Sequence, residues 1–249
     1  MARGGPWGIP TRQTQRRRPP PKPLAGMTTA TGICTFMPQS VDRLILTQWL
    51  SPAFPVGSYA YSQGLEQAIA DGAVTDAASL IDWIIAILKH GSARNDAILL
   101  AHARNEARTE DDLAELAYAY TASAERGMEM REQGAAFGQI IAGMTGTQPP
   151  PLPYALAVGH ATRRLDLPTP EVLALFLHAL ATQLTLVGVR FIPLGAAQGQ
   201  QLLGQLVPLI ATLDRQFATE PLSALSSATL GADIAAMRHE TLEVRIYRS

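Results

Sequence analysis

The stretch VLALFLHALATQLTLVGV, residues 172–189, restricts the fold more than any other part of the chain, because its 18 residues carry no formal charge. By length alone it could cross a membrane. His178, Thr182 and Thr185, however, recur at i, i+4 and i+7, so a helix here would carry a polar stripe. A threonine and a proline at 169–170 supply the cap and the first-turn proline of an ordinary protein helix. We therefore predict a central helix buried among other helices, and no association with a membrane.

Helical periodicity continues through most of the chain after Met37. Segments with helical patterns or caps lie at about 40–50, 62–70, 76–90, 93–107, 111–124, 125–144, 154–166, 170–191, 196–218 and 222–238. No alternating strand pattern precedes the last eight residues. The sequence thus predicts an all-α protein, a single globular bundle of about nine or ten helices over residues 37–249. A proline-rich hinge at 145–153 could divide this bundle.

The first 36 residues differ in composition from the rest of the chain. Residues 1–36 hold six Lys or Arg residues and no Asp or Glu, although the whole chain has a net charge of −1. This basic, proline-rich lead is predicted to be disordered, and it lacks the apolar run of a secretory signal. The remainder is acidic, which argues against nucleic-acid binding. The single cysteine, Cys34, allows no internal disulfide and no thiolate metal cluster, which fits the reducing cytoplasm.

The common catalytic and cofactor motifs are missing from the sequence. It contains no G-x-x-x-x-G-K-[ST], no G-x-G-x-x-G and no G-x-S-x-G, and its five histidines show no metal-ligand spacing. We therefore expect no catalytic activity, and no cofactor or metal bound directly. One alternative is a helical enzyme or small-ligand-binding protein with a core pocket near His178. Another is a nickel carrier, which scattered histidines and one cysteine disfavour.

The first distinctive motif is SPAFPVGSYAYSQGLE at 51–66, with two prolines, two glycines and two tyrosines. Prolines stiffen the backbone, and Tyr59 and Tyr61 offer large apolar faces with a hydroxyl tip, as interface residues do. Gln63 and Glu66 lie near the start of the next helix. The motif fits either a rigid connector with its tyrosines in the core or a preorganised recognition surface.

A second motif, VRFIPLGAAQGQQLL at 189–203, lies where two predicted helices meet. Arg190 ends the first helix, where a cation complements the helix dipole. Gln198 opens the second helix, next to a glycine and a further glutamine. A simple helix–helix corner explains everything here except this unusual glutamine–glycine spacing.

The C-terminal motif, DIAAMRHETLEVRIYRS at 233–249, begins as a helix and then alternates in polarity. Leu242, Val244 and Ile246 fall on one side of the alternating part, and no other strand is available to pair with it. We predict an extended tail, 240–249, that becomes ordered on another protein. The simpler alternative is a frayed chain end.

In this order, the three motifs resemble the UreF family of urease accessory proteins. LSPAFPVGSYAYSQGLE is similar to the family's S-P-x-x-P-x-G and S-x-Q-G-L-E signature, IPLGAAQGQQLL to its P-L-G-Q-x-x-G-Q segment, and AAMRHETLEVRIYRS to its M-R-H-E…R-x-[FY]-R-S ending. REQGAAF at 131–137 and YALAVGHATRRLDLP also match in place. The resemblance covers about 40–249. It departs from the family at Ala196, where glutamine is usual, and it excludes the lead, 1–36.

The resemblance implies an all-α, dimeric protein without catalytic activity of its own. It further implies a complex with UreD (also called UreH) and the GTPase UreG that inserts nickel into apo-urease. In that complex UreF would bridge UreD and UreG and regulate GTP hydrolysis, while the partners handle nickel and GTP. 

Partner contacts are then expected on the motif residues of this chain. They are Tyr59, Tyr61, Gln63, Glu66, Arg190, Gln198, Met237, Arg238, His239, Glu240, Arg245, Tyr247 and Arg248. We expect Met237 to Ser249 to dock on UreD, and Glu66 and Arg190 to lie toward UreG. Burying the apolar side chains of the tail cannot offset the cost of ordering its backbone. Arg238, Arg245 and Arg248, which we call the tail arginines, should therefore need charged partners on UreD.

Overall fold

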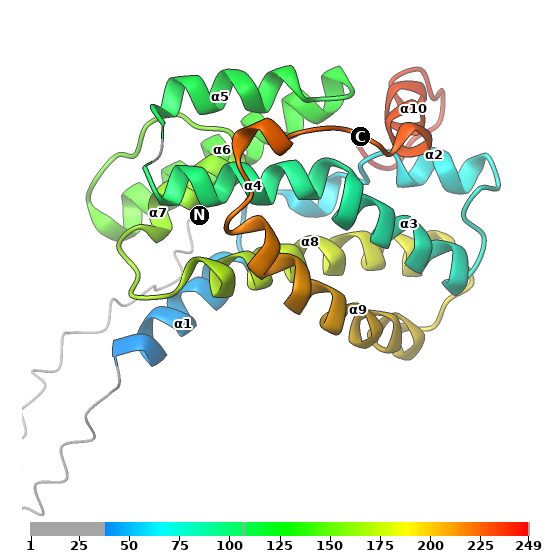
Figure 1. The fold of residues 1–249 in the computed structure, drawn as a ribbon. Helices are drawn as coiled ribbons and strands as arrows, with labels where there is room; N and C mark the ends of the chain where they lie inside the picture. Colours follow the sequence, from blue (N-terminus) through cyan, green and yellow to red (C-terminus); the bar gives the residue numbers. More distant parts are fainter. Residues whose placement is uncertain (1–37, 107, 249) are drawn as a thin grey trace, which may run out of the picture. The chain divides into compact units, whose positions relative to one another are not determined.

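A computed structural model describes residues 38–106 and 108–248 (Figure 1). The lead that the sequence predicts to be disordered, 1–36, lies outside the described residues. Within them the chain is all-helical, as predicted, and contains no strand. The α-helices are α1 (Pro38–Trp49), α2 (Leu65–Ala70), α3 (Ala77–His90), α4 (Ser92–Arg104), α5 (Glu110–Ala119), α6 (Ala124–Thr145), α7 (Tyr154–Thr162), α8 (Thr169–Phe191), α9 (Ala196–Phe217) and α10 (Leu230–His239). Two single-turn 3-10 helices, η1 (Ser58–Ala60) and η2 (Leu222–Ala224), lie between them.

Side-chain caps fix several of the helix starts. Asp76 accepts a hydrogen bond from the backbone N–H of Ser79 at 2.8 Å and begins α3, and α3 ends at Gly91. Both ends agree with the prediction from the sequence. Thr109 and Ser123 cap α5 and α6 in the same way. Such caps satisfy backbone donors that have no partner inside the helix, so they can be found from sequence alone.

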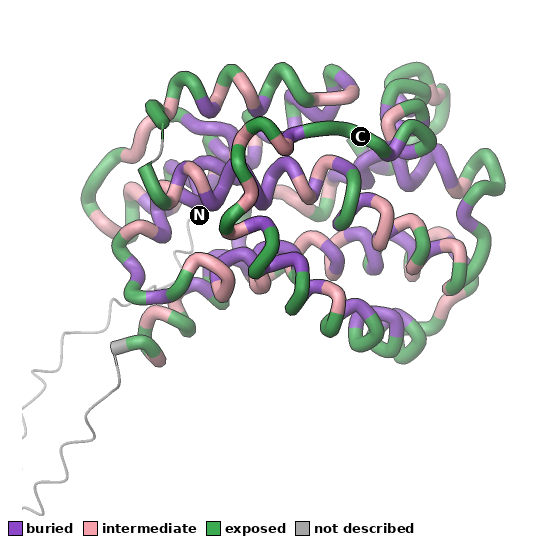
Figure 2. The backbone as a smooth tube through the Cα atoms, viewed as in Figure 1, coloured by how far each residue is buried: buried purple, intermediate pink, exposed green. Residues whose placement is uncertain are grey.

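The core of the described chain is one continuous cluster of apolar side chains to which every α-helix contributes. Helix α4 packs against α3, α5, α7, α8 and α9, and most of its residues are buried (Figure 2). The cluster includes residues on both sides of the proline-rich segment 145–153.

Helix α8, which contains the uncharged stretch, packs most extensively against α9 and also contacts α3 and α4. The hydroxyls of Thr182 and Thr185 donate to backbone carbonyls one turn earlier in α8, both at 2.8 Å. His178 and Leu186 are exposed, so the predicted central helix is buried on one side only. Among the described helices, α8 alone has the length and composition to cross a membrane. Core helices of water-soluble proteins share these properties, so this observation is weak support for a membrane span.

The prediction of a continuous helix at 222–238 is wrong for the first half of that range. The structure has the single turn η2, then a loop, and only afterwards α10. In the loop, the backbone N–H of Ser226 donates to the side chain of Asn95 at 3.1 Å, and that of Ala228 donates to the carbonyl of His90 at 3.1 Å. These bonds to distant residues replace the bonds that would have continued a helix.

Candidate functional site

The C-terminal segment, which we define as residues 240–248, lies against its own chain. The backbone N–H of Arg248 donates to the carbonyl of Ala60 at 2.7 Å. Those of Ile246 and Tyr247 donate to the carboxylate of Glu66 at 2.8 and 2.9 Å. The prediction of a tail without a partner in its own chain is therefore wrong. A side-chain carboxylate and a loop carbonyl take the place of the missing strand.

Glu66 belongs to a buried network of charged groups. His239 is fully buried, with Nε2 at 3.1 Å from Glu66 Oε2 and Nδ1 at 2.7 Å from Glu125 Oε2. Glu125 also pairs with the guanidinium of Arg245. Each ring nitrogen of His239 therefore lies within hydrogen-bond distance of a different carboxyl group. This network joins α2, the start of α6, the end of α10 and the C-terminal segment.

A second anchor holds the end of the segment. The guanidinium of Arg248 pairs with Glu132 at 2.6 Å and lies over the ring of Tyr61 at 5.7 Å from its centroid. The hydroxyl of Tyr61 donates to the same carboxylate of Glu132. Burial, and then this hydrogen bond, raise the pKa of Tyr61, and the hydrogen bond lowers the pKa of Glu132. The tyrosine therefore stays neutral and the carboxylate ionised near neutral pH.

The end of α8 contacts the segment through aromatic groups. Tyr247 is buried, and its ring centroid lies 5.5 Å from that of Phe191. The guanidinium of Arg190 lies 5.9 Å from the same tyrosine ring. Arg190 thus meets the C-terminal segment while remaining exposed itself.

Gly64 brings the first motif into close contact with α10. Its φ is +79°, a conformation that suits glycine. A Cβ added at Gly64 would lie 2.6 Å from the backbone nitrogen of Ala236. The approach of α2 to α10 therefore depends on the absence of a side chain at this position.

Two more of the predicted residues have structural partners. Gln63 is buried and donates from Nε2 to Glu129 Oε1 at 3.2 Å. Glu240 accepts a hydrogen bond from the backbone N–H of Ala124 at 2.7 Å, at the start of α6. An acidic group suits this position, because helix N-termini carry partial positive charge.

The tail arginines have partners within the chain. Arg245 and Arg248 pair with acidic residues of α6, as described above, and Arg238 pairs with Asp71 at 2.9 Å. The expectation that they would need charged partners on another protein is therefore wrong. Glu66 is only 5% exposed, so the expectation that it faces a partner directly is also wrong.

A few predicted residues are free to meet another molecule. Tyr59 is 78% exposed and Met237 is 50% exposed. Gln198 is exposed at the start of α9, where its Oε1 accepts a hydrogen bond from the backbone N–H of Gly195 at 2.9 Å. Of the second motif, Arg190 and Phe191 contact the C-terminal segment.

The sequence analysis missed a buried charged group on α6. Arg126 pairs with Asp96 of α4 and, at 2.7 Å, with Glu129. All three are at most 8% exposed. The attraction of both carboxylates outweighs burial and raises the pKa of Arg126, while burial raises the pKa of Asp96. A usable signal was present: Arg126, Glu129 and Gln133 recur at i, i+3 and i+7. In a helix they share the face that also holds Met130 and Phe137, so polar groups fall on the buried face.

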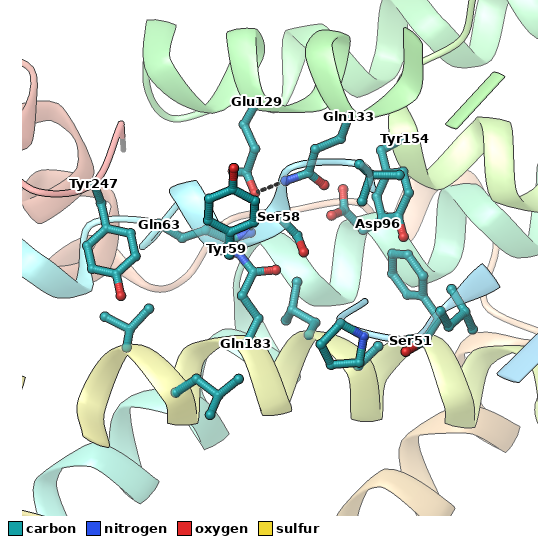
Figure 3. Close-up of a pocket in the computed structure, with 18 of the residues that line it drawn as sticks. Ser51, Ser58, Tyr59, Gln63, Asp96, Glu129, Gln133, Tyr154, Gln183 and Tyr247 are labelled. Carbon is teal, nitrogen blue, oxygen red and sulfur yellow. Dashed lines mark hydrogen bonds between the residues drawn. The ribbon is translucent and has the colours of Figure 1, made fainter. Parts of the chain in front are cut away.

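A cavity of about 220 Å³ lies beside this charged group. Its walls come from the first motif, α4, α6, α7 and α8 (Figure 3). The alternative prediction is a core pocket near His178, and this cavity lies next to that position in α8. His178 is exposed and does not line the cavity, whereas Ala179, Leu180 and Gln183 do.

The fold and the site together define a class of protein. No group of three or more His, Cys, Asp or Glu side chains is placed to hold a metal ion among the described residues. The sequence motifs hold the C-terminal segment in position and leave aromatic and apolar side chains exposed, as in all-helical proteins that act by binding other proteins.

Comparison with known proteins identifies the family. The UreF family model matches residues 74–207. The urease accessory protein UreF of Cereibacter sphaeroides (strain KD131) is 52% identical over 210 residues, which are 84% of this chain and 100% of that protein. Those of Dinoroseobacter shibae and Paracoccus denitrificans (strain Pd 1222) are 47% and 43% identical, over 83% and 86% of this chain and 98% and 99% of their own lengths. The chain belongs to the UreF family of urease accessory proteins.

Proposed function

We propose that this chain is a non-catalytic component of a complex with UreD and the GTPase UreG, and that the complex inserts nickel into apo-urease with GTP. In this proposal the chain acts as a cytoplasmic homodimer that bridges UreD and UreG and regulates GTP hydrolysis. It binds neither nickel nor GTP itself. The observation that carries the proposal is the 52% identity to a urease accessory protein UreF along that protein's whole length.

The direct test is activation of urease in co-expression. The urease subunits, UreD and UreG are produced with nickel, with and without this chain, and urease activity and nickel content are measured. We expect urease activity and nickel content to depend on the chain. We also expect residues 37–249 to support both as well as the full chain does, which would show that the lead is dispensable. Equal activity and nickel content without the chain would contradict the proposed role.

The surface proposed for UreD consists of exposed apolar residues on α10 and the C-terminal segment. We call it the α10–tail surface: Leu230, Ile234, Met237, Val244 and Ile246, which are 72, 44, 50, 84 and 60% exposed. The helical members recur at i, i+4 and i+7, the spacing of one helix face. The intramolecular contacts of residues 246–248 already order the segment, so docking would not bear the full cost of ordering its backbone.

We expect Val244→Asp and Ile246→Asp to weaken UreD binding without destabilising the fold. Each side chain is exposed, so its replacement removes no contact of the core. Losing its burial against a partner costs roughly 1.5–3 kcal/mol, or roughly tenfold or more in Kd. Isothermal titration calorimetry with UreD would measure this. The matched control is Val207→Asp on α9, where Val207 is 49% exposed outside this surface. Equal weakening by all three substitutions would contradict a specific α10–tail surface.

The proposed UreG side includes Tyr59 and Arg190, which are exposed. Both line the cavity mentioned above. Glu66 is buried, so in this proposal it acts on UreG only by holding the C-terminal segment.

A further inference from the structure

The cavity has a polar side formed by α4, α6 and α7. Figure 3 shows Asp96, Gln133 and Tyr154 directed toward the same space, with Gln183 of α8 facing them. Gln133 donates from Nε2 to Glu129 at 3.0 Å, and Gln183 donates from Nε2 to the carbonyl of Tyr61 at 2.9 Å. Both amides therefore donate an N–H group to the wall, and the carbonyl oxygen of an amide is an acceptor that a donor in the cavity can use.

The wall behind these oxygens holds more buried carboxyl groups than cations. Asp96 and Glu129 both pair with Arg126, and within the described ranges no other cation pairs with either, so two buried carboxyl groups share one guanidinium. Arg190 is the only other cation among the residues lining the cavity. It is exposed and lies over the ring of Tyr247. A buried net charge is costly unless a counter-charge or a proton neutralises it. Burial raises the pKa of Asp96. The carboxyl group can therefore be neutralised either by binding a proton or by a cation in the cavity.

Apart from Gln183, the α8 side of the cavity is apolar. It is lined by Phe176, Leu180 and Val187 of α8, by Leu50 and by Pro52 of the first motif. A ligand that matches both sides has a donor-rich positive head and a short hydrocarbon stem. The stem would displace water from apolar surface, and the head would donate to carboxylate and amide oxygens.

We propose that this cavity binds an alkylguanidinium or alkylammonium group, with the cation facing Asp96, Gln133 and Gln183 and the stem against α8. The group could be carried by a free small cation or by an arginine or lysine side chain of a binding partner. Tyr59 and Arg190 belong both to this cavity and to the proposed UreG side. Cation binding does not require the proposed role in urease maturation, so either proposal can fail while the other stands.

Calorimetry with small probes on the full chain tests the site. The probes are butylguanidinium and butylammonium, with butylurea as a neutral molecule of similar shape. We expect the cations to bind at least tenfold more tightly than butylurea. Equal binding of butylurea, or no binding of either cation at millimolar concentration, would overturn the proposal.

Two substitutions locate the bound cation. Asp96→Asn removes the charge, and Gln183→Leu removes an acceptor on the opposite wall and keeps the proposal testable if the first variant does not fold. Each should weaken cation binding at least tenfold. Gln205→Leu, an exposed glutamine of α9 outside the cavity, should change nothing. Unchanged binding in a folded Asp96→Asn or Gln183→Leu variant would overturn the assignment.

Two further measurements define the chemistry and the source of the cation. Binding should strengthen as pH rises through the titration of Asp96, whose charged and titratable neighbours are Arg126, Glu129 and Tyr154. Binding that does not vary with pH would overturn the role of Asp96.

If butylguanidinium competes with UreD or UreG for the chain, the natural cation is a partner side chain. If it binds without competing, the natural cation is a free small molecule.

Discussion

Replacing Glu66 with alanine should destabilise the protein by about 3–5 kcal/mol, the usual cost of removing one partner from a buried charged group. The substitution leaves His239 fully buried without its second carboxylate. It also removes the acceptor of the backbone N–H groups of Ile246 and Tyr247. Buried donors without partners cost about 1–3 kcal/mol each, so we expect the C-terminal segment to leave its position rather than stay unsatisfied.

Urea denaturation would measure the change in the free energy of unfolding, and hydrogen exchange would follow the amides of Ile246 and Tyr247. We expect both amides to lose protection in Glu66→Ala. The control is Glu171→Ala, which removes the surface ion pair with Arg43. That change should cost about 1 kcal/mol or less. If Glu66→Ala matched the control and kept both amides protected, Glu66 would not be what holds the segment.

Much of the fold could be predicted because its signals are local. The start of α3 at Asp76 and its end at Gly91 depend on residues within one turn of each boundary. The uncharged stretch of α8 likewise predicted a long helix that packs inside a helical protein. Local patterns could not show that α4, rather than α8, has most of its residues buried.

The errors in the predicted helices come mainly from hydrogen bonds between residues far apart in sequence. The segment after η2, 225–229, contains no proline or glycine to end a helix, yet the backbone N–H of Ala228 bonds to His90, at the end of α3. Helix α2 begins three residues later than predicted because Gln63 and Gly64 adopt positive φ. Periodicity reports which residues favour burial, but it does not report which distant backbone group will compete for an N–H.

The sequence predicts the candidate site as a set of motifs, but it does not predict the contacts within the chain that several of their residues make. Glu66 lies early in a helix, where an acidic side chain is usually solvated. Its partners lie more than 170 residues further along the chain. The arginines at 245 and 248 were assigned to another protein for the same reason, since nothing local shows that Glu125 and Glu132 lie opposite them.

Replacing Gly64 with alanine should destabilise the protein by about 2–5 kcal/mol. The positive φ of +79° costs a non-glycine residue about 1–2 kcal/mol. The new Cβ would also lie 2.6 Å from the backbone nitrogen of Ala236, so α10 must shift, and overpacking of this kind costs about 1–3 kcal/mol. Because His239 is on α10, a shift of that helix should also disturb the network that holds the C-terminal segment.

Gly57→Ala provides the matched control, because Gly57 has nearly the same φ, +77°, but no atom within 4 Å of an added Cβ. It should show the backbone cost alone, about 1–2 kcal/mol. The difference between the two variants in urea denaturation therefore isolates the contact between α2 and α10. Equal destabilisation by both would mean that α10 adjusts freely. The first motif and the C-terminal motif would then be held together by the Glu66 network and not by backbone packing.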